Sequence, residues 1–152
     1  MIEKSLNISE AVNERSIAGF SLVDKTGLYR PTVGEVVEIY NNDELVFAGS
    51  IDDLPEMMIE GTTTLLFQNI PIVDFHQSAD RKLVAESYEN RTAGFIVKDI
   101  LNKYLAEEGI TEGEIQDGVV VQKAVFNYLT VSQCLDELSE LTGFQWKINP
   151  DK

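Results

Sequence analysis

Few residues of this sequence are of the kinds and in the patterns found in catalytic or metal-binding sites. His76 is the only histidine and Cys134 the only cysteine, so neither has a second residue of its kind to complete a transition-metal site. A serine nucleophile is usually placed by a turn such as G-x-S-x-G, and the chain has no such motif. We therefore interpret His76 as structural, and we predict no catalytic residue, no metal site and no cofactor site.

Two adjacent acid pairs are the remaining candidates for chemistry. Asp52 with Asp53 and Glu107 with Glu108 could in principle serve glycoside cleavage or calcium binding. Adjacent side chains diverge on a strand or a helix, and neither pair has the alternating spacing of a calcium loop. We interpret both pairs as solvated surface. The glycines never form a phosphate-binding loop, so we predict turn or helix-end roles for Gly34, Gly49, Gly109 and Gly143.

The composition of the chain limits the kinds of molecule that it can bind. The chain has 152 residues and a net charge of −14, from 26 acidic and 12 basic residues. Residues 1–90 hold 16 acids and 6 bases, and residues 91–152 hold 10 and 6. Binding to nucleic acid depends on Lys and Arg, so we expect DNA to be repelled. No apolar stretch is long enough to span a membrane, so we expect no membrane insertion, and a lone cysteine suits a chain made in a reducing cytoplasm.

The first part of the chain has the alternating pattern of β-strands. A hairpin is indicated by two β-branched runs that flank residues 41–44, where Asn and Asp tolerate a tight turn. We predict a small antiparallel β-barrel over residues 1–88, with His76 in one of its strands and with Gly61 among its turns. Its strands are expected at residues 16–23, 36–40, 45–51, 62–67, 72–77 and 82–87, and its core is expected to include Phe20, Tyr40, Phe47, Phe67 and Phe75.

The pattern changes to helical spacing at residues 89–92, and we predict a small α/β unit with two helices over residues 89–152. The first helix, at about 93–108, has Thr92 as its cap and Gly109 at its end. The second, at about 131–142, has a capping box of Thr130 and Gln133 and ends at Gly143. Its buried face is expected to be Val131, Cys134, Leu135, Leu138 and Leu141, and a strand is expected at residues 144–148. The fold class is thus α+β.

Four stretches of the sequence resemble one family. Residues 13–40 and 45–52 are similar to the opening strand, turn and hairpin of phage tail hub proteins. Residues 74–110 and 124–148 resemble the strand–helix–strand–helix–strand continuation of the same family, which includes late control protein D. The resemblance covers nearly the whole chain, and its motifs are structural.

The resemblance implies a non-enzymatic structural component of a phage or prophage tail tip or baseplate hub. Members form homotrimers that join the tail tube to the tip and let DNA pass without specific binding. The protein would be made in the host bacterial cytoplasm and reside in the virion tail tip, with its carboxylates facing the channel. Such proteins usually continue into a second barrel, so we expect this chain to be a fragment that is monomeric when isolated.

Two other functions are left open by the residues. A carbohydrate-binding module for the host surface would need two or three exposed aromatic side chains in one groove. A cell-wall-degrading or peptidase enzyme would need a clustered set of His, Cys or acidic residues, which the sequence does not display.

Overall fold

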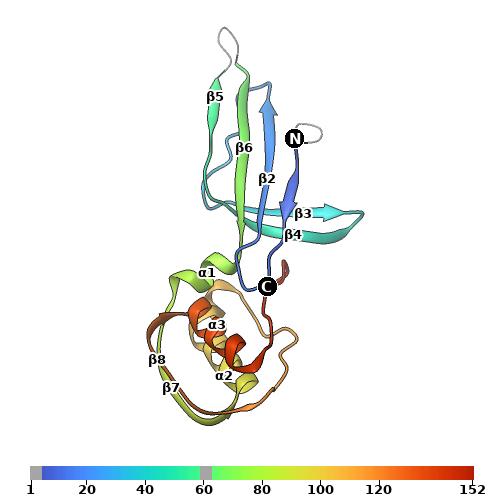
Figure 1. Cartoon of the computed structure of the whole chain (residues 1–152). Coiled ribbons are helices and arrows are strands. Elements are labelled where there is room, and N and C mark those ends of the chain that lie inside the picture. Colours follow the sequence, from blue (N-terminus) through green and yellow to red (C-terminus); the bar gives the residue numbers. More distant parts are fainter. Residues whose placement is uncertain (1–4, 59–62) are drawn as a thin grey trace. The chain divides into compact units, whose positions relative to one another are not determined.

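The computed structural model describes residues 5–58 and 63–152, which divide into two compact units (Figure 1). The first unit contains residues 15–75 with the N-terminal strand, and the second contains residues 12–14 and 76–150. The predicted Gly61 turn lies outside the described residues. The strand expected at 82–87 lies in the second unit because it pairs with a strand of that unit alone.

The first unit is one antiparallel sheet in which a long strand, β6, has neighbours on both sides. Strand β2 (Ile17–Asp24) pairs along one edge of β6 (Leu65–Asp74). The other edge pairs first with β5 (Glu56–Met58) and then with the end of β4 (Glu44–Ile51). Two outer strands complete the order β1-β2-β6-β4-β3: β1 (Asn7–Ser9) and β3 (Val36–Asn41).

The prediction of a closed barrel is wrong, although the α+β class is confirmed. Closure would require pairing between the outer strands β1 and β3, and no such pairing occurs among the described residues. Strand β4 pairs with β6 only at Gly49, Ser50 and Ile51, so the β3–β4 hairpin projects sideways from β2 and β6 (Figure 1). Strand β1 has only three residues with which to close the other side.

One strand replaces two predicted strands because a bulge is stabilised inside it. Asn69, which falls between the strands predicted at 62–67 and 72–77, has φ 53° and lies within β6, where the pairing with β2 shifts between Phe20 and Leu22. The Asn69 N–H donates to the Oγ of buried Ser21 at 3.0 Å. A backbone donor that leaves the ladder is thereby satisfied, and the strand continues through the irregularity.

The apolar core of the first unit includes part of the predicted aromatic set. Phe47 and Phe67 are buried, and Phe20 packs partly buried beside them. Tyr40 is 55% exposed, so the prediction that it belongs to the core is wrong. The predicted hairpin is confirmed: Asn42 and Asp43 have φ of 48° and 69° and join β3 to β4 in a two-residue turn.

The second unit packs helices on a two-stranded ribbon. Strand β7 (Leu83–Thr92) pairs antiparallel with β8 (Val120–Thr130). The helices are α1 (His76–Arg81), α2 (Ala93–Ile100) and α3 (Val131–Thr142), and α2 continues through a π-helical turn (Leu101–Leu105) and a 3-10 turn (Ala106–Glu108). Both predicted helices are therefore confirmed. The predicted strand at 72–77 ends earlier, in β6, and its residues from His76 onward belong to α1.

The predicted helix ends are confirmed by their hydrogen bonds. Thr92 accepts from the Phe95 N–H, and Thr130 and Gln133 form the reciprocal capping box. Gly109 and Gly143 end their helices with φ of 76° and 73°. Leu141 is 63% exposed, which corrects its predicted place on the buried face of α3. Within the described ranges, none of the helices has the length and apolar composition needed to cross a bilayer.

Candidate functional site

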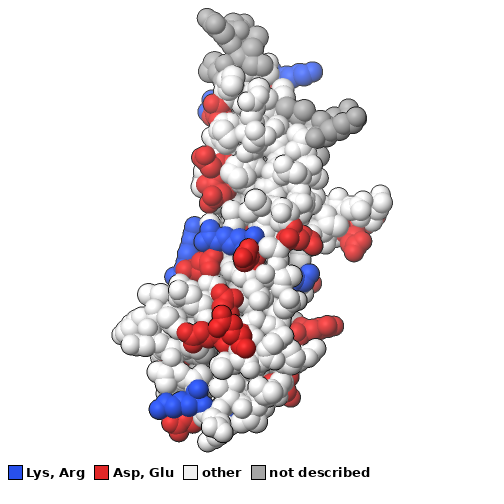
Figure 2. All heavy atoms as spheres, viewed as in Figure 1, with Lys and Arg blue, Asp and Glu red and all other residues white. Residues whose placement is uncertain are grey.

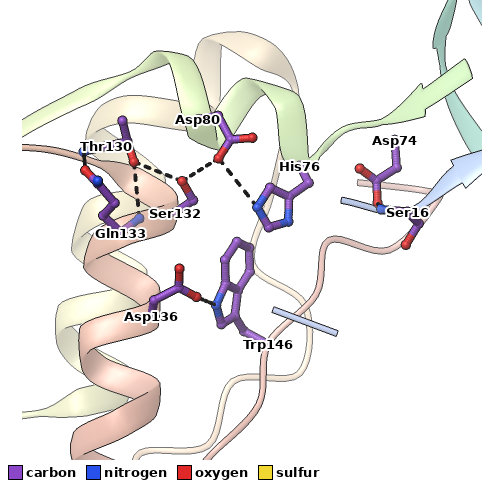
Figure 3. Close-up of polar contacts among 9 residues, drawn as sticks. All are labelled: Ser16, Asp74, His76, Asp80, Thr130, Ser132, Gln133, Asp136 and Trp146. Atoms are coloured by element: carbon purple, nitrogen blue, oxygen red, sulfur yellow. Dashed lines mark hydrogen bonds and ion pairs between the residues drawn. The ribbon is translucent and has the colours of Figure 1, made fainter. Parts of the chain in front are cut away.

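The second unit contains a group of polar side chains around His76, the most chemically distinctive residue of the chain (Figure 3). His76 begins α1, and Asp80 lies one turn later on the same helix, so that their Nε2 and Oδ1 atoms are 3.6 Å apart. The imidazole is buried and stacks on the indole of Trp146, with 4.5 Å between ring centroids. Sequence reasoning missed this group because α1 was not predicted.

Asp80 connects α1 to the start of α3. Its Oδ1 accepts a hydrogen bond from the Ser132 hydroxyl at 2.5 Å, and the Ser132 Oγ lies 2.9 Å from the Oγ1 of Thr130. Thr130 is also the cap of α3, where its hydroxyl accepts from the Gln133 N–H. The capping box and the His76–Asp80 pair are therefore parts of one hydrogen-bonded group.

A serine, an aspartate and a histidine lie together here, but not in the order that hydrolysis needs. In a catalytic triad the histidine lies between the other two, because it must take the proton of the serine hydroxyl. Here Asp80 lies between Ser132 and His76. Ser132 is itself buried, so its hydroxyl is not presented to a substrate. The arrangement joins two helices, and it does not activate a nucleophile.

Trp146 holds the chain's last segment against this group, and the strand predicted at 144–148 is absent. The Trp146 Nε1–H donates to Asp136 on α3 at 2.9 Å. Its backbone N–H donates to the Asn13 side chain at 2.9 Å, and its carbonyl accepts from the Asn13 N–H at 3.1 Å. These bonds to Asn13 take the place of the strand ladder that the alternating apolar pattern predicted.

One acid of each predicted surface pair is engaged locally. Asp53 accepts the N–H of Leu54 at 2.8 Å, and Glu108 pairs with Lys82 at 2.9 Å, which lowers the pKa of the Glu108 carboxyl. Among residues 5–58 and 63–152 no group of three or more His, Cys, Asp or Glu side chains is placed to hold a metal ion. Cys134 is buried on α3, and burial, followed by the Glu137 charge, raises the pKa of its thiol to about 12.

Open strand edges are the second candidate site. In the first unit the sheet order ends at β1 and β3, and in the second unit β7 and β8 pair only with each other within the described chain. Unpaired strand edges present rows of N–H and C=O groups that another strand can use. The exposed apolar side chains on or next to these edges include Val36, Tyr40, Leu83, Val120, Val125 and Tyr128. Such surfaces suit assembly better than catalysis.

Comparison with known proteins shows which solved structures share the fold of this chain. No protein-family model matches the chain, and no curated protein sequence matches it significantly. The chain is similar to the 43 kDa tail protein of prophage MuSo2 from Shewanella oneidensis, with a TM-score of 0.65 at 14% identity over 86% of this chain. It is also similar to a tail protein from Neisseria meningitidis MC58, with a TM-score of 0.64 at 16% identity over 90% of this chain.

These likenesses show the fold, which the chain shares with these two tail proteins. The chain spans about two fifths of the length of these solved structures, 42% of the first and 40% of the second. Coverage of this chain at 86% and 90% includes parts of both units. The likeness therefore extends to part of the first unit and part of the second.

Proposed function

We propose that this protein is a structural component of a phage or prophage tail. The observation that carries the proposal is the match of the fold to two tail proteins from different bacteria over at least 86% of this chain. The polar group around His76 supports a structural role, because Asp80 separates the hydroxyl of Ser132 from the imidazole. The open strand edges give such a protein surfaces for neighbours.

Within the tail, we place the protein at the tip or baseplate hub, as the resemblance of residues 13–52 and 74–148 implies. There it would join the tail tube to the tip as a homotrimer. In a closed ring of three identical copies, each copy contacts the next through two different surfaces. Each unit of this chain offers two different open edges, which suits such a contact.

The charge of the chain supports a role in DNA passage. Figure 2 shows Asp and Glu side chains on the viewed face of each unit, with a group of Lys and Arg side chains among them. With a net charge of −14, the surface would repel phosphates and let a duplex slide through a channel without binding. We infer that part of the acidic surface faces the channel. A trimer structure with the acidic excess on the outer face would contradict this inference.

The test is to find the protein in particles. The gene would carry an epitope tag in its own phage or prophage, and purified particles would be examined by mass spectrometry and by gold-labelled antibody in the electron microscope. We expect the tag in every intact particle, with the label at the end of the tail away from the head. Label along the tube would contradict the tip placement, and absence from particles would contradict the tail function.

A binding assay separates this function from a carbohydrate-binding role. The purified chain would be tested against cell-wall and surface polysaccharides of the host by sedimentation with the polysaccharide. If the chain is a structural component, we expect it not to sediment with the polysaccharide. Saturable binding together with absence from particles would favour the carbohydrate-binding module.

A further inference from the structure

Strand β8 is the longest strand of the described chain and has one unpaired edge. It runs from Val120 to Thr130, and its partner within the described chain is β7. Val120 and Val125 are 59% and 55% exposed, and Tyr128 is 72% exposed. Long exposed strands of this kind are usually interrupted by charges or proline, and β8 contains no proline and a single charged residue, Lys123.

The charge pattern around β8 differs from that of the rest of the chain. Residues 118–135 contain no Asp or Glu, and this is the longest acid-free run in a sequence with 26 acidic residues. The run begins just before β8 and continues into α3. Two copies that each carry a charge of −14 repel one another over most of their surfaces. They can approach along β8 without opposing carboxylates.

The outer face of the ribbon is also suited to close approach. On this face Val125 lies opposite Ser87, and Asn127 lies opposite Ala85. These side chains are small or uncharged. The charged residues of this face are Lys123 on β8 and Glu89 opposite it on β7.

Strand β7 carries the charge that complements β8. It also has one unpaired edge, and it carries Glu86, Glu89 and Arg91. Glu86 is paired with Lys103 and Arg91 lies over the Phe95 ring, so Glu89 is the negative charge that this strand offers to a partner. Strand β8 carries Lys123 alone and has a net charge of +1. Pairing of two β8 strands would instead bring two lysine-bearing strands together.

We propose that β8 of one copy pairs edge to edge with β7 of a second copy, through backbone hydrogen bonds that extend the two-stranded ribbon. The proposal rests on the proposed function, since it names the surface through which a tail component would contact its copies. It replaces the expectation from the sequence that the isolated chain is monomeric. Because the two edges differ, the contact is head to tail and can be repeated around a ring. The edge strand β3 is less suitable, since it is shorter and carries Glu38 with Glu35 just before it.

Charge variants at Val125 test the proposal with the full chain. Val125→Glu places a carboxylate in the acid-free strip, on the same face as Glu89 of the incoming strand. We expect it to weaken self-association by about fivefold or more, because like charges on neighbouring strands destabilise pairing. Val125→Lys should retain or strengthen association. The matched control is Val36→Glu, because Val36 is also 55% exposed and lies on the edge strand β3 of the other unit.

Sedimentation equilibrium over a concentration series up to the millimolar range is the measurement, with circular dichroism to verify that each variant is folded. The β8–β7 contact is supported if Val125→Glu weakens association while Val125→Lys and Val36→Glu do not. Equal weakening by Val125→Glu and Val125→Lys, weakening by Val36→Glu, or a monomeric wild type at every concentration would overturn it. These outcomes are separable from failure of the tail function, since the particle experiment can succeed while the contact proves to lie elsewhere.

Discussion

Asp24 is the residue whose protonation is most closely tied to local structure. Its carboxylate accepts the Thr26 hydroxyl at 2.6 Å, and the N–H groups of Thr26 and Tyr29 at 2.8 and 2.7 Å. The hydrogen bond from the Thr26 hydroxyl is the largest cause that lowers the pKa of Asp24 to about 2, against an opposing effect of burial. The ionised form thus fixes the turn after β2.

We expect this turn to make stability depend on pH at the acid end. Because the folded pKa lies below the ordinary value of 3.8, the contribution of Asp24 is present above that value and is lost as the pH falls towards about 2. Carbon NMR should show the Asp24 carboxyl titrating near 2. Asp24→Asn should lower stability at neutral pH and remove this part of the acid dependence. A carboxyl that titrates near 3.8 would contradict the prediction.

Cys134 gives a second prediction for a single residue. The thiol is fully buried on α3, and its pKa is raised to about 12 by burial and then by the Glu137 charge. Reactive thiols are accessible and have a low pKa. A thiol reagent such as DTNB should therefore react with the folded protein only at the rate of unfolding, and at once in denaturant. Fast stoichiometric labelling of the native chain would show that the α3 packing is different.

At the scale of elements, α3 provides a matched pair of leucines. Leu138 is 3% exposed and Leu141 is 63% exposed on the same helix. Leu138→Ala should cost roughly 2–5 kcal/mol of unfolding free energy, because it leaves a cavity in the core. Leu141→Ala should change the free energy by no more than about 0.5 kcal/mol. Urea denaturation of both variants is the measurement, and equal losses would refute the observed burial of α3.

Substitutions at two separate glycines test how closely β4 approaches β6. A Cβ added at Gly49 would lie 2.2 Å from the Val73 carbonyl oxygen, where β4 meets β6. Gly113 has no atom within 4 Å of an added Cβ. We expect Gly49→Ala to cost about 2 kcal/mol or more by displacing β4, in the range of severe single substitutions. Gly113→Ala should be nearly neutral, and thermal unfolding of the two variants compares them directly.

The sequence allowed the helices to be predicted better than the strands because helix ends depend on local residues. Thr92, Thr130 with Gln133, and Gly143 each act on backbone groups within a few residues. The continuity of β6 could not be read in this way, because the N–H of Asn69 is satisfied by Ser21 from a distant strand. Trp146 shows the same limit: its backbone bonds to Asn13, at the other end of the chain, replace a predicted strand.

At the scale of the whole molecule, the α+β class could be predicted from periodicity, whereas the closure of the sheet could not. Closure depends on whether β1 and β3 can reach each other, and that depends on how few residues of β4 pair with β6. The group around His76 was also beyond prediction, since it joins α1, α3 and the segment after α3. The interpretation of His76 as structural rests on its being the only histidine, and it stays a prediction.

The charge of the molecule leads to a prediction for the whole chain. At −14, it should not be retained by duplex DNA even at about 20 mM salt, where screening is weak and any basic patch would be most effective. A gel-shift experiment with a labelled duplex is the measurement, and a basic DNA-binding protein of similar size is the control. A salt-sensitive shift would mean that the few Lys and Arg residues form a phosphate-binding surface, and a channel wall built from this chain would then hold DNA instead of letting it pass.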